Sequence, residues 1–191
     1  MSLGMYNRMN STVQRLDNFL PEVTFNHIQK MLMDVSGQFP YNYRSGLSFP
    51  EDRGFIFSNT LFHDYPTPLK NMHPHPMQII RRDMEPWFNS IAIPLVSRLS
   101  MSRLLRVFVN CNPRMSRIDP LMSAFHTDFD SPHLVGIYCV NTCNGYTEFE
   151  DNTRLESIAN TMYVFDGSLA HRAVMQTDEN IRVNINIGFE E

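Results

Sequence analysis

The sequence predicts a mainly β protein with supporting helices, in which N-terminal helices pack on one face of an antiparallel β-sandwich or barrel. Apolar residues recur at helical spacing before about residue 103, and short β-type runs separated by Gly, Pro, Asn and Asp follow. The final run, residues 182–189, alternates between apolar and polar side chains. Helices followed by many strands are typical of an α+β arrangement with the helices on one side.

The length and composition of the chain predict a single globular domain. Its 191 residues can enclose one core and are too few for two substantial ones. We therefore expect a helical and irregular half, residues 1–102, packed on a β core, residues 103–191. The net charge of −4 argues against a nucleic-acid partner. The sequence contains no apolar run as long as a membrane span.

The cysteines and the start of the chain favour a reducing, cytoplasmic setting. Cys111, Cys139 and Cys143 are an odd number at spacings that suit neither a disulfide framework nor a zinc ribbon. The first residues lack a basic region followed by an apolar stretch, which a secretory signal would have.

The N-terminal half is expected to contain a short strand at residues 13–16 and several helical pieces. Residues 39–76 show no steady period and are expected to be irregular with short strands. From residue 77 apolar residues again keep helical spacing, and Pro86 and Pro94 should divide this segment into two helical pieces. The first helix is predicted from apolar residues at steps of three and four that precede a glycine, namely Phe25, Ile28, Leu32 and Val35, then Gly37.

Six runs in the C-terminal half are predicted to be strands. In the last of them the apolar residues at 183, 185, 187 and 189 share one face and can pack on the helices. Arg182, Asn184 and Asn186 share the other face, which would form a ligand-binding wall if it looked into a barrel. The predicted strands are residues 104–110, 134–140, 146–150, 155–158, 162–165 and 182–189.

Three residues form a candidate metal site. His126 and Asp128 lie two positions apart, so on an extended strand both side chains project from one face. His171 follows Asp128 by 43 residues, just after a predicted strand. Two histidines and a carboxylate on one face of an octahedron leave coordination positions open, as in non-haem iron(II) oxygenases. A His-x-Asp pair alone is a weak indication, because short motifs often match by chance.

Arg182 strengthens the metal-site hypothesis. It lies eleven residues after His171 and opens the last strand on its polar face. A guanidinium forms two parallel hydrogen bonds to a carboxylate and stays charged, so it could hold the distal carboxylate of a keto acid. The alternative is a surface arginine paired with Asp178 or Glu179.

These motifs resemble the 2-oxoglutarate/Fe(II) oxygenase superfamily, specifically its prolyl 4-hydroxylase-like branch. The resemblance covers roughly residues 103–189, and the stretch 16–21 before the first helix is similar to small phage and bacterial members. The matching segments are residues 108–113, 126–128, 137–141, 145–149, 164–166, 171 and 182–184.

The resemblance implies a double-stranded β-helix, or jelly roll, with N-terminal helices packed on the major sheet. It implies Fe(II) bound by the catalytic triad His126, Asp128 and His171, and 2-oxoglutarate held by Arg182. Members of this family use dioxygen to hydroxylate a C–H bond and release succinate and carbon dioxide, with ascorbate as a candidate reductant. The carboxylate of Asp128 disfavours halogenation, because halide-transferring relatives lack it.

The resemblance implies further contacts to the cosubstrate. Asn110, Asn112 and Asn184 are candidates, with turn bonding as the alternative for the first two. Cys139 stands where many relatives carry a tyrosine that contacts the cosubstrate, which puts that contact in doubt. Thr147 is expected to line the barrel.

Two other functions use the same residues. One is a metal-binding jelly roll that acts as a binding or assembly module without turnover. The other is a hydrolytic metalloprotein, for which the sequence offers no clear general base and no purpose for Arg182. The primary substrate, a peptidyl residue or a small metabolite, would be set by the loops at residues 39–76 and 115–123. The oligomeric state is open, a homodimer included, and a phage origin would place the protein in the host cytoplasm.

Overall fold

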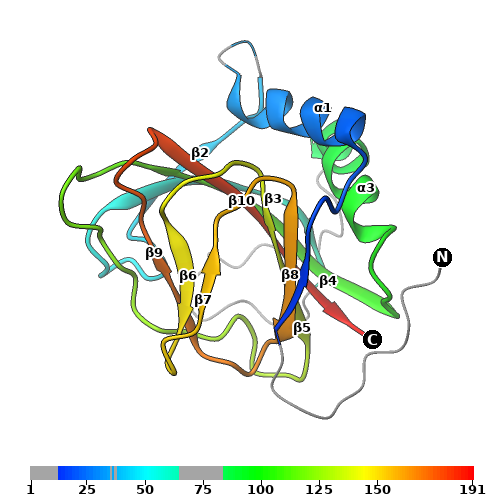
Figure 1. The fold of residues 1–191 in the computed structure, drawn as a ribbon. Helices are drawn as coiled ribbons and strands as arrows, with labels where there is room; N and C mark the ends of the chain where they lie inside the picture. The colour runs from blue at the N-terminus through cyan, green and yellow to red at the C-terminus, as the bar shows by residue number, and fades with distance from the viewer. Residues whose placement is uncertain (1–12, 35, 37, 65–83) are drawn as a thin grey trace.

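The computed structural model describes residues 13–34, 36, 38–64 and 84–191. In these residues two antiparallel sheets face each other, and α1 and α3 cover the outer side of the larger sheet (Figure 1). This is the mainly β jelly-roll architecture with supporting helices that was predicted. Val35, Gly37 and residues 77–83, used in the helix predictions, lie outside the described residues. None of the helices in the described part of the chain is long and apolar enough to span a membrane.

The larger sheet has seven strands, and every neighbouring pair is antiparallel. Three of its strands come from residues before 103, so the N-terminal half extends the sheet as well as covering it. In spatial order the strands are β1 (Gln14–Leu16), β8 (Thr161–Asp166), β5 (Leu134–Cys139), β10 (Ile181–Glu190), β4 (Arg103–Pro113), β3 (Phe55–His63) and β2 (Asn42–Ser45).

The smaller sheet has three strands, β7 (Arg154–Glu156), β6 (Tyr146–Phe149) and β9 (His171–Val174), in that order. All six C-terminal strands that were predicted are present. Strand β9 was not predicted, because only its two end residues are buried and no alternation marks it. Strand β3 is longer than the short strands that were predicted for residues 39–76. A register shift between Thr60 and Phe62 interrupts the alternation of its side chains.

The helices differ from the prediction in one respect. Helix α1 (Glu22–Met33) buries Ile28 and Leu32, as its spacing indicated. The expected two pieces around the prolines instead form one continuous stretch of α2 (Glu85–Trp87), the π-helix η2 (Phe88–Ala92) and α3 (Ile93–Val96). Pro94 has no N–H to donate, and it lies in the first turn of α3, where proline is tolerated. The N–H of Ile93 bonds to the oxygen of Phe88 in the wider π pattern.

The alternation in β10 separates the core from a cavity. Val183, Ile185 and Ile187 are fully buried in the main apolar cluster, together with Ile28 of α1 and Leu95 of α3. The opposite face looks into the space between the two sheets. A second apolar cluster, which includes Ile137, Phe149 and Phe165, joins the two sheets beside that space.

Asn160 fastens the N-terminal segment to the sheet. Its side chain accepts hydrogen bonds from the Leu20 N–H and the Tyr138 hydroxyl and donates one to the Leu20 oxygen, all at 2.9 Å. Its backbone has a φ of 57°, in the left-handed region that asparagine tolerates better than most residues. Asn160, between β7 and β8, therefore holds the chain at Leu20, in addition to the pairing of β1 with β8.

We expect Asn160→Ala to lower the free energy of unfolding by about 3–4 kcal/mol, from three buried hydrogen bonds of about 1 kcal/mol each and a left-handed backbone penalty of about 1 kcal/mol. Urea denaturation followed by circular dichroism measures the loss. Asn152 also has a positive φ, 68°, but its side chain is exposed. Asn152→Ala should therefore lose only the backbone contribution, and equal losses in the two variants would contradict the role given to Asn160.

Candidate functional site

The polar faces of β10 and β4 line a cavity of about 1060 Å³ between the two sheets. Arg182, Asn184 and Asn186 contribute from β10, and Asn110 and Asn112 from β4. These residues come together because β10 pairs with β4 so that Arg182 faces Asn112 and Asn184 faces Asn110. The polar face of the last strand therefore forms the wall of a cavity, as its alternation suggested.

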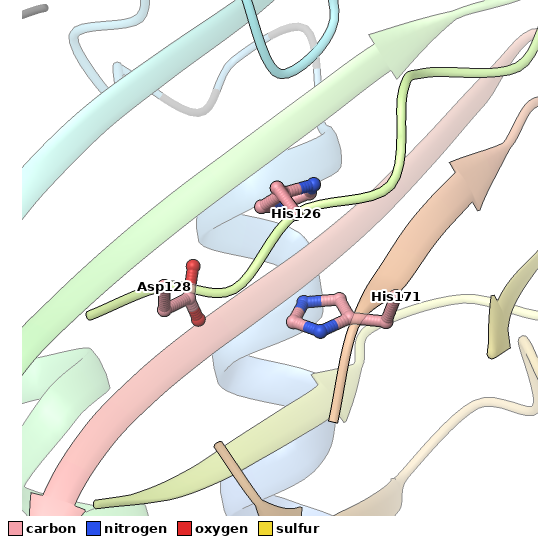
Figure 2. A group of neighbouring side chains, drawn as sticks. All are labelled: His126, Asp128 and His171. Carbon is pink, nitrogen blue, oxygen red and sulfur yellow. The ribbon is translucent and has the colours of Figure 1, made fainter. Parts of the chain in front are cut away.

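The cavity contains the three predicted metal-binding residues. Figure 2 shows the side chains of His126, Asp128 and His171 converging from a loop and from the start of β9. Their ligand atoms all lie within 4.8 Å of one another. His126 and His171 exchange two backbone N–H to oxygen bonds of 3.0 Å, which form an isolated β-bridge. His126 and Asp128 were expected to lie on an extended strand. The structure instead holds this segment by the single β-bridge between His126 and His171.

Both histidine rings are oriented by the backbone. Nδ1 of His126 lies 3.3 Å from the oxygen of Ala124, and Nδ1 of His171 lies 3.0 Å from the oxygen of Leu169. With the hydrogen on Nδ1, each ring presents the lone pair of Nε2, the arrangement found in metal-binding histidines. Burial is the main cause that lowers the pKa of His171, and it favours the neutral ring that binds metals.

Asp128 is an ionised carboxylate, and one of its oxygens has no hydrogen-bond partner among the described residues. Nη2 of Arg106 lies 2.7 Å from Oδ1 of Asp128. Oδ2 is buried and has no hydrogen-bond partner in the described structure. Burial would raise the pKa of Asp128, but the charges of Arg106 and the two histidines lower it to about 2. A buried, charged oxygen without a donor fits a bound cation, so the three residues suit a divalent metal.

Arg182 is 1% exposed, although it carries a charge. Its guanidinium donates to the Ser157 hydroxyl at 2.6 Å, to the Tyr146 backbone oxygen at 3.1 Å and to the Thr147 hydroxyl at 3.2 Å. No carboxylate among the described residues forms an ion pair with it. Burial lowers the pKa of Arg182, yet a guanidinium stays protonated in proteins. A buried cation without a counter-charge is costly, so this position favours an anionic ligand.

The alternative interpretation of Arg182, a surface pair with Asp178 or Glu179, is wrong. Asp178 accepts a hydrogen bond from the Asn144 N–H at 2.9 Å, and it lies outside the cavity. Arg114, not Arg182, donates to the backbone oxygen of Asp178.

The other predicted contacts divide into two groups. Nδ2 of Asn110 donates to Oδ1 of Asn184 at 3.1 Å, and Nδ2 of Asn112 donates to the backbone oxygen of Arg182 at 3.2 Å. Thr147 lines the cavity, as expected. Cys139 is not among the lining residues, since its side chain packs in the apolar cluster between the sheets, where burial raises the pKa of its thiol.

Three residues of the site were not found from the sequence. Arg106 holds Asp128, Ser157 holds Arg182, and Arg44 lines the cavity from β2. The signal for Arg106 was its place in β4, on the same face as Asn110 and Asn112. Ser157 and Arg44 gave no such signal, because tertiary folding alone brings them to the site.

Comparison with solved structures supports the fold. A prolyl hydroxylase in complex with a hypoxia inducible factor peptide fragment, from Trichoplax adhaerens, matches with a TM-score of 0.61 at 13% identity over 94% of this chain and 84% of its own. A Pseudomonas putida prolyl-4-hydroxylase matches with a TM-score of 0.57 at 11% identity, over 94% and 92%. The epimerase SnoN in complex with Fe3+, alpha ketoglutarate and nogalamycin RO gives 0.57 at 10%, over 94% and 78%.

No family model and no curated protein sequence matches this chain. At sequence identities this low, the structural matches establish only a shared fold. That fold is the jelly roll of the 2-oxoglutarate/Fe(II) oxygenases. The predicted fold is thereby confirmed.

We expect the protein to bind one Fe(II) ion per chain under anaerobic conditions. Asp128→Ala and His171→Ala should each weaken binding by more than about 100-fold, because even residues that only support a metal ligand contribute about 10- to 100-fold. Isothermal titration calorimetry measures the affinity, and circular dichroism checks the fold. His27 is an exposed histidine on α1, so His27→Ala is the control. Binding at full affinity by both site variants would place the metal elsewhere.

Proposed function

We propose that the protein is an iron(II)- and 2-oxoglutarate-dependent oxygenase that hydroxylates a C–H bond, with succinate and carbon dioxide as coproducts. One observation carries this proposal. A single cavity contains both an unpartnered Asp128 oxygen beside two histidines and a buried Arg182 without an anion. The first group suits a divalent metal, and the second suits the distal carboxylate of a keto acid.

Nε2 of His126, Nε2 of His171 and Oδ2 of Asp128 would bind the metal. When bound, Fe(II) with 2-oxoglutarate supplies the activation of dioxygen that the side chains cannot provide. Arg106 holds the other Asp128 oxygen, so it keeps the carboxylate in one orientation. The backbone oxygens of Ala124 and Leu169 fix the tautomers of the two rings.

Arg182 is prepared to bind a carboxylate. A guanidinium has five N–H donors, and the three hydrogen bonds to Ser157, Tyr146 and Thr147 leave two of them available. Those three partners also prevent the side chain from turning away when the pocket is empty. The low exposure of Arg182 keeps water from competing for the ligand, which strengthens the ion pair.

A hydrolytic function is less well supported. The cavity lining includes one further carboxylate, Asp130, and it is exposed. A hydrolase would also leave the buried charge of Arg182 without a role. A binding module without turnover would retain the metal but form no succinate. An assay of succinate formation therefore distinguishes such a module from an oxygenase.

We expect succinate to form from 2-oxoglutarate only when Fe(II), 2-oxoglutarate and dioxygen are all present, since each supplies a necessary part of the reaction. His126→Ala should reduce the rate by more than about 100-fold, because it removes a metal ligand. Mass spectrometry of succinate gives the rate, and His27→Ala serves as the control. Formation of succinate at the wild-type rate by His126→Ala or without iron would refute the proposal.

Arg182 can be tested with a matched pair of ligands. 2-Oxopentanoate has the carbon chain of 2-oxoglutarate but lacks its distal carboxylate. In the metal-loaded protein, 2-oxoglutarate should bind on the order of 100-fold more tightly than 2-oxopentanoate. This ratio is equivalent to about 3 kcal/mol, as expected of a charge-assisted, bidentate contact.

In Arg182→Gln this ratio should fall close to one, while metal affinity stays near the wild-type value. The ratio between two ligands within one variant does not depend on how much the substitution destabilises the fold. A ratio that persists in Arg182→Gln would mean that another group binds the distal carboxylate.

A further inference from the structure

Arg44 is a third cation in the cavity, and neither the metal site nor the keto acid pocket uses it. It lies on β2 and is half-buried. It makes no ion pair with any described residue. Arg106, by contrast, is paired with Asp128, and Arg182 is almost fully buried and donates a hydrogen bond to Thr147. Among the described residues, Arg44 is therefore a cation of the cavity that has no ion-pair partner and that neither proposed ligand uses.

Contacts through Phe108 connect Arg44 to the metal site. The Arg44 guanidinium lies 5.3 Å from the centre of the Phe108 ring, and the Arg106 guanidinium lies 5.7 Å from the same centre. Arg106 in turn contacts Asp128. One aromatic ring and one guanidinium thus separate Arg44 from a metal ligand. A molecule held by Arg44 would therefore lie in the same cavity as His126, Asp128 and His171.

The wall beside Arg44 is apolar and anchored. Phe49 and Leu47 line the cavity from the loop between β2 and β3, and the Phe49 ring lies 5.9 Å from the His126 ring. Asp52 holds this loop by accepting hydrogen bonds from the Phe49 N–H at 3.0 Å and the Ala124 N–H at 3.2 Å. The same Asp52 side chain therefore joins the loop to the segment that carries His126.

We propose that Arg44 binds an oxyanion of the primary substrate, a carboxylate or a phosphate, and that the substrate is an organic anion with an apolar body. The proposal rests on the proposed function and names the substrate class of that site. The guanidinium supplies the charge and a planar set of donors, and the rings of Phe49 and Phe108 supply the apolar surface. Asp130, the exposed carboxylate of the lining, forms no ion pair with Arg44 and does not occupy it.

The test compares anionic and neutral probes that carry the same 4-fluorophenyl ring. Protein loaded with Zn(II) and 2-oxoglutarate cannot turn over, because zinc has no redox chemistry, and its Arg182 is already occupied. 4-Fluorobenzoate, 4-fluorophenyl phosphate and the neutral 4-fluorobenzamide are titrated separately, and fluorine NMR gives each affinity. We expect at least one anion to bind about tenfold more tightly than the amide, as one charge-assisted contact provides. The tighter anion identifies the oxyanion as carboxylate or phosphate.

Variants assign the preference to Arg44. Arg44→Gln should bring the affinities of anion and amide together, and Arg44→Lys should retain part of the preference, because it keeps the charge but not the planar donors. Arg53 is an exposed arginine of the same loop that does not line the cavity, so Arg53→Gln should behave as wild type. Thermal melting confirms that the variants fold.

Three results would overturn the proposal: an amide that binds as tightly as both anions, an anion preference that survives in Arg44→Gln, or no anion binding at millimolar concentration. Failure of the proposed function looks different. In that case Zn(II) and 2-oxoglutarate would not bind, whereas the share of the anion preference due to Arg44 could still be measured in metal-free protein by comparing wild type with Arg44→Gln.

Discussion

The pairing of β10 with β4 and β5 is the constraint on which the site depends. Strand β10 lies in the middle of the larger sheet, so its register with both neighbours is fixed. Its alternate residues then have opposite environments. Ile185 and Ile187 are buried against the helices, and Arg182 and Asn184 face the cavity. A slip of one residue would exchange the two sets and place a guanidinium in the apolar core.

The cavity keeps polar atoms without protein partners, which a fold optimised only for stability would avoid. Oδ2 of Asp128 and Oδ1 of Asn110 are buried and unbonded among the described residues, and Arg182 is buried without a counter-charge. Groups of this kind cost stability unless a ligand satisfies them. Arg106 holds the carboxylate of Asp128 in the orientation that a metal would need. Ser157, Tyr146 and Thr147 accept hydrogen bonds from Arg182 and hold its guanidinium in the orientation that a carboxylate would need.

Much of this was predictable from local patterns. The alternation of β10 and the two-residue spacing of His126 and Asp128 are properties of consecutive residues, so the amino-acid sequence alone is enough to detect them. Strand β9 and the partners Arg106, Ser157 and Arg44 were not predicted. Their roles arise from contacts between segments far apart in the sequence, such as Arg182 with Ser157 or Arg44 with Phe108. In the described part of the segment from residue 77, no break separates the helical turns on either side of Pro94, since a π-helical turn precedes it. The single-domain organisation, the cytoplasmic location and a role for ascorbate stay predictions.

We propose that one cavity binds a metal at His126, Asp128 and His171 and, together with it, a keto acid at Arg182. An anaerobic crystal structure with Fe(II) and 2-oxoglutarate tests this claim most directly. We expect one anomalous iron peak between the three side chains, with the keto acid chelating the iron and its distal carboxylate paired with the Arg182 guanidinium. Iron bound at other residues, or a keto acid that does not contact Arg182, would contradict it.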